Sequence, residues 1–148
     1  MNTIDAIQEI IDNGKRIVFF TGAGVSTDSG IPDFRSQDGL YHTKYAYPPE
    51  EILSHSFFMH SPEEFYRFYR DKMLYPDVQP NYVHTFIAKL EEMGKSLGVV
   101  TQNIDGLHQK AGSKHVYELH GSVSRNYCTK CHHFYDESYI LNTSGIPK

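Results

Sequence analysis

The sequence predicts an α/β fold built on a parallel sheet, and two observations support this prediction. Short apolar runs typical of buried strands, such as "RIVFF" and "LGVV", alternate with longer segments whose apolar residues recur at helical spacing. Strands separated by helices pair in parallel, because a crossover helix returns the chain to the same end of the sheet. With 148 residues, of which 39% are hydrophobic and 22% charged, the chain has the size and composition of one domain.

The N-terminal segment predicts a helix, then a strand, then a loop. Four isoleucines stand at helical spacing: Ile4, Ile7, Ile10 and Ile11. Gly14 follows where such a helix would end. The run "RIVFF" (16–20) has no polar alternation, so we expect a strand that is covered on both faces. The segment "TGAGVSTDSGIPDFRSQDG" (21–39) is rich in Gly, Ser and Asp, which favours a loop rather than a helix.

A second helix is predicted in "SPEEFYRFYRDKML" (61–74). Ser61 and Glu64 have the spacing of a capping box, and Pro62 stands at the first helical position, where its missing N–H costs nothing. The aromatic stripe of this helix is interpreted as core packing: Phe65, Phe68 and Tyr69. We therefore expect this helix to pack through its aromatic side chains rather than to bind a ligand with them.

A third helix and two strands complete the predicted sheet. The helix in "NYVHTFIAKLEEMGK" (81–95) has one apolar face: Val83, Phe86, Ile87 and Leu90. Gly94 is expected to end it. "LGVVTQN" (97–103) then predicts a buried strand, and "VYELHGSV" (116–123) alternates apolar with polar residues as another strand would. After it the composition changes to a cluster of Cys, His and Tyr.

Charge and hydropathy exclude several classes of function. The formal net charge is −4 and the lysines and arginines are scattered, so the sequence predicts no direct binding of nucleic acid. The apolar runs are too short for a membrane span, and the N-terminus lacks the pattern of a signal peptide. We therefore expect a cytoplasmic protein that does not bind membranes.

A Gly-rich turn follows the first predicted strand. Gly22 and Gly24 would let backbone amides approach a phosphate closely, although Thr27 stands where the dinucleotide fingerprint has its third glycine. The alternative is that these are simply loop glycines. The continuation "GIPDFRS" places Asp33, Phe34 and Arg35 side by side near the proposed phosphate site. Arg35 could pair with a phosphate and Phe34 could cover an aromatic ring, or both could be ordinary surface and packing residues.

Four blocks, "GAGVSTDSGIPDFRS", "TQNIDGLHQKAG", "ELHGSV" and "CTKC", resemble in order and spacing the motifs of the sirtuins, the NAD-dependent protein deacylases, and most closely those of bacterial members. The resemblance implies a Rossmann-like parallel sheet, incomplete in this chain, with a helical insertion at about 37–75. It assigns 1–123 to the NAD-binding domain and 124–148 to the first part of a small zinc-binding module. Because the family pattern continues with a second C-x-x-C pair, we expect a truncated chain that folds poorly alone.

The resemblance also implies an NAD site. Its residues would be Gly22, Ala23, Gly24, Thr27, Asp33, Phe34, Arg35, Gln102, Asn103, Ile104, Asp105 and His120. In this picture Phe34 shields the nicotinamide end, and Ile104 and Asp105 hold the carboxamide. A carboxylate suits that role, because it accepts hydrogen bonds from an amide NH₂. Gln102 and Asn103 would lie near the ribose.

His120 matches the family's catalytic base, and Asn103 is the second residue with an implied catalytic role. An imidazole titrates near neutral pH and can take a proton from a ribose hydroxyl. The implied reaction passes the acyl group of an acyl-lysine protein or peptide to ADP-ribose, and it releases nicotinamide and free lysine. The alternatives are an ADP-ribosyltransferase or NAD hydrolase that uses the same site, and a non-catalytic module that binds NAD or zinc.

Cys128 and Cys131 form the only C-x-x-C pair of the sequence. Such a pair can be a disulfide, an attachment site for c-type haem, a redox dithiol or part of a zinc site. A cytoplasmic location disfavours a disulfide and c-type haem attachment, and no helix follows as it does in a redox dithiol. A structural zinc site remains, for which this chain supplies two of four thiolates. His132 and His133 could complete a site, but adjacent residues rarely direct both side chains at one metal.

Overall fold

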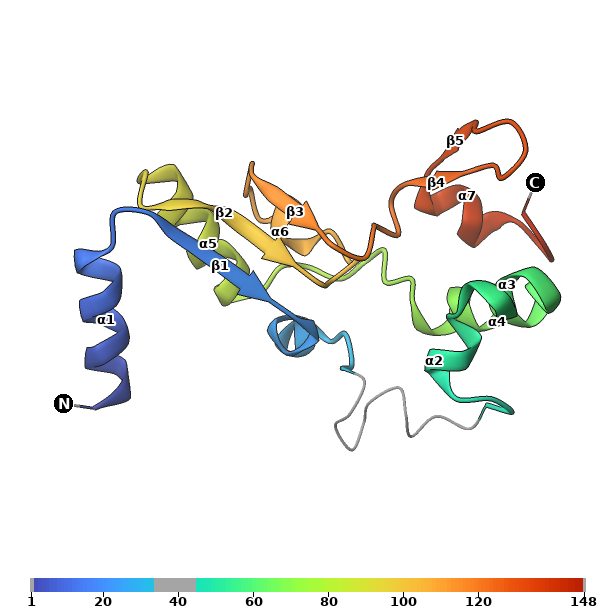
Figure 1. Ribbon diagram of the computed structural model, residues 1–148, viewed down its shortest axis with the longest axis horizontal. Helices are drawn as coiled ribbons and strands as arrows, with labels where there is room; N and C mark the ends of the chain where they lie inside the picture. The colour runs from blue at the N-terminus through green and yellow to red at the C-terminus, as the bar shows by residue number, and fades with distance from the viewer. Residues whose placement is uncertain (1, 34–44, 148) are drawn as a thin grey trace.

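The computed structural model describes residues 2–33 and 45–147 (Figure 1). The helices are α1 (Thr3–Asn13), the 3-10 helix η1 (Ala23–Ser29), α2 (Pro49–Ile52), α3 (His55–His60), α4 (Pro62–Lys72), α5 (Tyr82–Glu92), α6 (Leu107–Lys110) and α7 (Glu137–Asn142). The strands are β1 (Ile17–Thr21), β2 (Ser96–Thr101), β3 (Val116–Glu118), β4 (Asn126–Tyr127) and β5 (Phe134–Tyr135). The first three form a parallel sheet in the order β1-β2-β3, and the last two form an antiparallel pair. The predicted α/β class with a parallel sheet is confirmed.

The register of the sheet aligns the ends of its strands. Thr21 is paired with Thr101, and Thr101 with Glu118, so β1, β2 and β3 all end at the same edge. Ligands of open α/β sheets bind outside the carboxyl ends of the strands. The segments that follow these three residues contain most of the residues implicated by the sequence.

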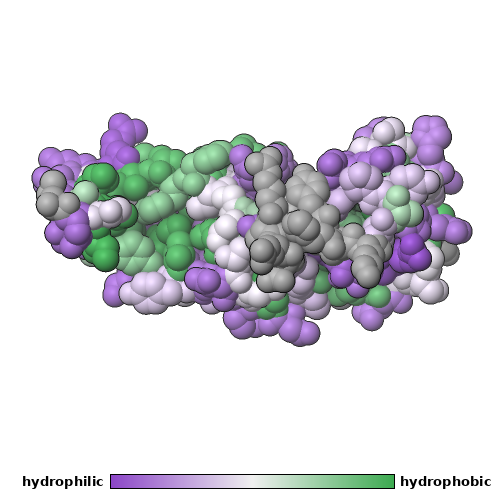
Figure 2. All heavy atoms as spheres, turned by 90° about the horizontal axis from the view of Figure 1, so that it is seen from below, coloured by the Kyte–Doolittle hydropathy of each residue, from purple (hydrophilic) through white to green (hydrophobic). Residues whose placement is uncertain are grey.

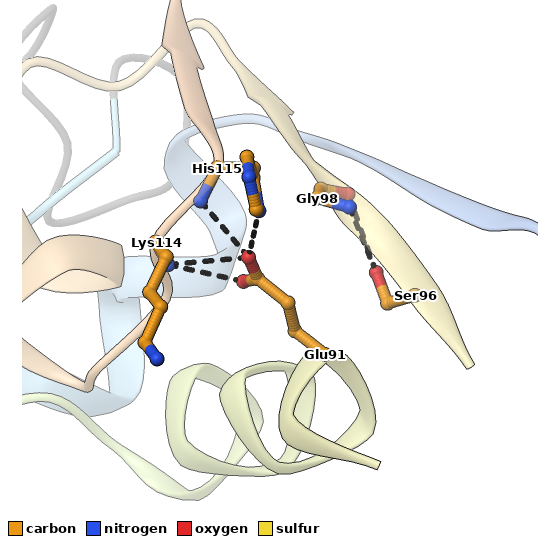
Figure 3. Close-up of polar contacts among 5 residues, drawn as sticks. All are labelled: Glu91, Ser96, Gly98, Lys114 and His115. Atoms are coloured by element: carbon orange, nitrogen blue, oxygen red, sulfur yellow. Dashed lines mark hydrogen bonds and ion pairs between the residues drawn. The ribbon is translucent and has the colours of Figure 1, made fainter. Parts of the chain in front are cut away.

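One glycine and one carboxylate hold β2 and β3 in this register. Gly98 has a φ of 138°, and an added Cβ there would lie 2.4 Å from the carbonyl oxygen of His115. Glu91, at the end of α5, accepts hydrogen bonds from the backbone N–H groups of Lys114 and His115 and from the His115 ring (Figure 3). Burial acts to raise the pKa of Glu91, but the bonds from His115 and Lys114 lower it overall. The same view shows the Gly98 N–H donating to Ser96 Oγ.

The face of β1 is less covered than its sequence predicts. Val18 and Phe20 are 55% and 66% exposed, so the expectation of a strand covered on both faces is wrong for the described structure. α1 forms as predicted and ends at Gly14, but none of its residues is buried. We name as the uncovered apolar surface Ile4, Ile7, Ile10, Val18 and Phe20. Figure 2 shows apolar side chains gathered at the end of the molecule that carries α1 and β1.

The segment after β1 is more regular than predicted. Residues Ala23–Ser29 form the 3-10 helix η1 rather than a loop, and Gly30 ends it with a φ of 92°. Tight 3-10 turns tolerate Ser, Asp and Gly better than a long α-helix does, because these residues favour local backbone hydrogen bonds. The composition therefore excluded an α-helix interior but not a short 3-10 helix.

The helical segment α2–α4 packs through aromatic rings. α4 begins at Pro62 as predicted, and Phe68 is fully buried. The predicted capping box does not form: Ser61 makes no side-chain cap, because it also ends α3 and has backbone angles set by both helices. Glu64 instead pairs with Arg67 one turn later. This segment lies within the predicted insertion at 37–75, whose limits stay a prediction.

Side chains also join α4 to the C-terminal part of the chain. Arg70 donates to the carbonyl oxygens of Ile140 and Gly145, at 2.8 and 2.6 Å. A small core of Leu74, Val123 and Ile140 lies between these parts. α4 and α7 are therefore held together near the end of the sheet that carries the candidate site. In the described ranges no helix is long and apolar enough to cross a membrane.

α5 is the third predicted helix, and its burial differs in part from its sequence pattern. Ile87 and Leu90 are buried as expected, whereas Val83 and Phe86 of the same predicted face are 43% and 37% exposed. The third buried residue of α5 is His84, which is completely buried. The helix ends at Glu92, just before the left-handed Gly94.

Candidate active site

A cavity of about 460 Å³ lies at the carboxyl edge of the sheet. Six predicted site residues line one wall: Ala23, Gln102, Asn103, Ile104, Asp105 and His120. The opposite wall comes from the helical segment and was not predicted: Leu53, Phe65, Tyr69, Lys72, Met73 and Tyr75. Phe65 and Tyr69 are thus part of this wall, although their stripe was interpreted as core packing. The structure brings together residues from η1, from the segments after β2 and β3, and from α4.

The predicted phosphate turn is placed at the start of η1. Gly22 precedes it in an extended conformation, and a Cβ on Gly24 would meet no atom within 4 Å. Neither glycine is needed for packing against described residues, and open space beside Gly24 leaves room for a ligand. Thr27 donates to the carbonyl oxygen of Gly24 and is exposed outside the cavity lining. Asp33 follows Pro32, which lines the cavity. Phe34 and Arg35 lie outside the described residues.

Asp105 is held by hydrogen bonds on both of its carboxylate oxygens. Ser26 Oγ donates to Oδ2 at 2.7 Å, and the Leu107 N–H donates to Oδ1 at 2.9 Å. Asn103 Nδ2 in turn donates to Ser26 Oγ at 3.1 Å. Ser26 is 1% exposed. Ser26 was not among the predicted site residues, since nothing in the sequence distinguishes it from the other serines of a Gly-rich turn. These contacts fix the carboxylate before any ligand binds, and each oxygen keeps a further lone pair as an acceptor.

Ile104 and Gln102 connect the same loop to its surroundings. The Ile104 carbonyl oxygen accepts the Val123 N–H at 3.0 Å, and the Ile104 side chain packs against the small core around Leu74. The Gln102 N–H donates to the carbonyl oxygen of Thr21 and continues the pairing of β1 with β2. The loop 102–105 is therefore anchored on both sides, which favours a preformed binding surface.

His120 stands two residues beyond the end of β3 and is exposed in the cavity. Its Nδ1 lies 3.1 Å from the carbonyl oxygen of Gln102. A carbonyl can only accept, so Nδ1 carries the proton of the neutral ring and Nε2 keeps its lone pair. This is the tautomer that a general base needs. Glu118, at the end of β3, is held by Arg125 at 2.7 Å, which fixes the backbone just before His120.

Two buried histidines near Asp105 were not among the predicted site residues. His84 and His108 are 0% and 1% exposed. Burial, and secondarily the neighbouring His84, lower the pKa of His108 to about 4, while Asp105 acts in the opposite direction. Burial also lowers the pKa of His84, again opposed by Asp105. Both rings are therefore neutral at pH 7.

Cys128 and Cys131 lie in the turn between β4 and β5. The Lys130 N–H points at Cys128 Sγ at 3.4 Å, and the His132 N–H closes the turn on the Cys128 carbonyl oxygen. Hydrogen bonds from the backbone N–H groups of Cys131 and Lys130 lower the pKa of the Cys128 thiol. Both cysteines are free thiols. Amide donors directed at a thiolate suit a metal ligand. In the described part of the chain, no three His, Cys, Asp or Glu side chains gather as a metal site.

Comparisons with known proteins agree with these features. A family model described as "Sir2 family" matches residues 22–147. An "NAD-dependent protein deacetylase" of Clostridium perfringens is 60% identical over 98% of this chain and 60% of its own length. One of Staphylococcus aureus is 50% identical over 95% of this chain and 59% of its own length. The chain thus spans about 60% of the length of the curated relatives it matches.

Solved structures show the same likeness. One described as "Sir2-p53 peptide-NAD+" has a TM-score of 0.78 and 41% identity, and the match covers 93% of this chain and 53% of that chain. A Sir2 complex with a deacetylated p53 peptide and 3'-O-acetyl ADP ribose has a TM-score of 0.83 and 42% identity, over 93% of this chain and 55% of that one.

Proposed function

The chain belongs to the Sir2 family, and from that premise we propose that the protein is an NAD-dependent protein lysine deacylase. The proposal rests on one observation: Asn103, Asp105 and His120 line the same cavity at the carboxyl edge of the sheet. These residues come from two loops of the sheet, and a carboxylate, an amide and an imidazole base are the groups that the reaction requires.

Asp105 would hold the nicotinamide end of NAD, and Ile104 would support it. The carboxylate is fixed by Ser26 and Leu107, and its remaining lone pairs can accept from the carboxamide NH₂. A fixed acceptor stabilises the bound pose without reorganising when the ligand enters. Gly22, Ala23, Gly24, Thr27, Asp33, Phe34 and Arg35 belong to the same proposal as the cofactor-binding segment.

His120 would act as the general base. NAD, as co-substrate, supplies the ribose carbon that receives the acyl oxygen and the nicotinamide that leaves. Proton transfer from a ribose hydroxyl to His120 Nε2 is supported by the hydrogen bond of Nδ1 to Gln102 O, which leaves Nε2 unprotonated. Asn103 keeps an amide oxygen that can accept from a ribose hydroxyl near this base.

The substrate of the proposal is an acyl-lysine protein or peptide. Solved relatives hold a p53 peptide together with NAD or with an acetylated ADP-ribose, which supports a peptide as the second substrate. Leu53, Phe65 and Met73 give the cavity an apolar wall that excludes water from the reacting groups. A cytoplasmic location and the absence of nucleic-acid and membrane partners remain parts of the proposal.

A structural zinc ion at Cys128 and Cys131 belongs to the proposal as well. The amide groups directed at Cys128 Sγ and its lowered pKa suit a thiolate ligand, so the pair fits half of a tetrahedral site. We also propose the division into an NAD-binding domain, 1–123, and a zinc-binding module, 124–148. Its support is that the β4–β5 pair forms a sheet separate from β1-β2-β3.

The test is turnover of NAD with an acetyl-lysine peptide by the full-length protein, followed by chromatography of nicotinamide and deacetylated peptide. His120→Ala should lower kcat by about a hundredfold or more, because a positioned base contributes at least that much, with NAD affinity nearly unchanged. His55→Ala, at an exposed residue that does not line the cavity, is the matched control and should keep full activity. A wild type that never consumes the peptide, or a His120→Ala variant with more than about a tenth of wild-type kcat, would contradict the proposal.

A further inference from the structure

His84 and His108 form a buried pair close to Asp105. Their ring centroids lie 4.8 Å apart with an interplanar angle of 62°, which is an edge-to-face contact. His84 comes from the first turn of α5 and His108 from α6, which begins two residues after Asp105. Neither residue lines the cavity. Fully buried histidines are uncommon unless their polar atoms are used, so the pair calls for a role beyond packing.

The hydrogen bonds determine where the protons of the pair lie. His84 Nδ1 accepts the Asn81 N–H at 3.2 Å, so the His84 proton is on Nε2. Thr21 Oγ1 donates to Thr101 Oγ1 at 2.8 Å and has no second proton to give. It must therefore accept from His108 Nε2, which lies 3.0 Å away, and the His108 proton is on Nε2. Within the described residues, His84 Nε2 and His108 Nδ1 have no hydrogen-bond partner.

His108 is connected to the catalytic loop through two threonines. Its Nε2–H donates to Thr21, Thr21 donates to Thr101, and Thr101 Oγ1 accepts the Asn103 N–H at 3.0 Å. The side chain of Asn103 continues to Ser26, which holds Asp105. Thr101 Oγ1 thus accepts from both Thr21 and Asn103, and the neutral imidazole of His108 is linked through Thr21 to the oxygen that holds the Asn103 backbone. Such chains strengthen when every member is oriented.

His84 is connected to η1 by a second path. Its Nδ1 fixes the N-cap residue Asn81, whose Nδ2 donates to the Val25 carbonyl oxygen in η1 at 2.7 Å. Val25 precedes Ser26. The two rings therefore link the loop after β2 with the 3-10 helix after β1, which are the two backbone segments that meet at Asp105.

We propose that His108 is a positioning residue of the deacylase site, which orients Asn103 through Thr21 and Thr101 and is seated against its buried partner His84. The inference rests on the proposed function, because orientation of Asn103 matters only if this loop binds the co-substrate. Among the described residues, the charged or titratable groups that face the two rings are each other and Asp105. Both imidazoles are neutral at pH 7, so each ring presents one donor and one acceptor. The hydrogen bond to Thr21 needs the donor of His108, and the hydrogen bond from Asn81 needs the acceptor of His84.

The test compares His108→Phe with His108→Gln in the full-length protein. Phenylalanine keeps a buried ring but cannot donate to Thr21, whereas the glutamine amide can restore that donor. We expect His108→Phe to speed hydrogen exchange of the Asn103 amide by about tenfold and to lower kcat by about tenfold or more, with KM for NAD nearly unchanged, since a lost buried hydrogen bond has an effect of this size. His108→Gln should recover most of both.

A second pair of variants covers the case in which His108→Phe fails to fold. Thr21→Val removes the bridging hydroxyl at constant shape and should reproduce both changes, whereas Thr21→Ser keeps the hydroxyl and should behave as the wild type. Unchanged exchange at Asn103 in His108→Phe and Thr21→Val, or a glutamine variant no better than phenylalanine, would overturn the proposal and leave the ring a packing residue. If exchange responds as expected but the wild type does not deacylate the peptide, the relay stands and the proposed function fails.

Discussion

β1 presents two different surfaces within five residues. At its carboxyl end Thr21 lies in a network of hydrogen bonds with Thr101 and His108, whereas Val18 and Phe20 on the same strand are 55% and 66% exposed. We therefore expect the candidate site not to depend on how well this face of the sheet is covered. The residues of the site are fixed by polar contacts among η1, α5, α6 and the loop after β2, and Val18 and Phe20 do not line the cavity.

The largest effect is expected where the register of the sheet is set, because a shift there would separate the polar ends of the strands. Gly98→Ala should lower the free energy of unfolding by about 3 kcal/mol or more, since its Cβ would collide with the His115 carbonyl oxygen at a φ reserved for glycine. Gly112→Ala is the matched control: it has a φ of 105° with no atom near the new Cβ, and should cost about 1 kcal/mol. Equal losses in urea unfolding would contradict the role given to His115.

The second effect concerns the polar end of the sheet and its response to acid. The pKa of His108 is lowered to about 4 in the folded protein, so between its ordinary value and 4 the unfolded chain binds a proton that the folded chain does not. Stability should therefore fall as the pH decreases from about 6.5 to 4, by about 3 kcal/mol from this residue. His108→Gln should show a pH dependence smaller by that amount in urea unfolding. Parallel curves for the two proteins would show that His108 does not stay neutral in the fold.

A smaller effect is expected at Glu91, which joins α5 to the start of β3. Glu91→Gln removes the charge that three donors of Lys114 and His115 share, and should cost about 1–2 kcal/mol. Glu92→Gln, the exposed neighbour on the same helix, should stay within about 0.5 kcal/mol of the wild type. Thermal unfolding distinguishes the two variants, and an equal change in both would mean that the Glu91 contacts are not formed in solution.

The smallest effect on stability is expected on the uncovered apolar surface. Phe20→Thr in the 148-residue chain keeps a residue that favours strands and should change the free energy of unfolding by less than about 0.5 kcal/mol. It should reduce the fluorescence of a hydrophobic dye that binds exposed apolar surface, and should leave hydrogen exchange at Asn103 unchanged. A faster exchange at Asn103 would show that the two surfaces of β1 are coupled after all.

Local patterns predicted most of the elements. Periodic isoleucines identified α1, Pro62 identified the start of α4, and the apolar runs identified β1 and β2. Coverage of the strands could not be predicted in the same way. An apolar run such as 16–20 indicates that its side chains can be buried. Whether they are buried also depends on a neighbouring element that covers that face of the strand.

The candidate site likewise has residues that the sequence predicts and contacts that it does not. His120, Asn103 and Asp105 stand in sequence motifs and lie together in the structure. The contact of Ser26 with Asp105 joins residues 79 positions apart, and the relay from His108 to Thr21 joins residues 87 positions apart. A lone Ser or His has no periodicity or spacing from which such long-range contacts could be inferred, so they depend on the register of the folded sheet.

The most direct test of the account is the identity of the sugar product formed by the full-length protein from NAD and an acetyl-lysine peptide, read by mass spectrometry. We expect acetyl-ADP-ribose in equal amount to released nicotinamide and deacetylated peptide, and the loss of all three in His120→Ala. Free ADP-ribose with an unchanged acetyl-lysine peptide, or ADP-ribose attached to protein, would contradict it.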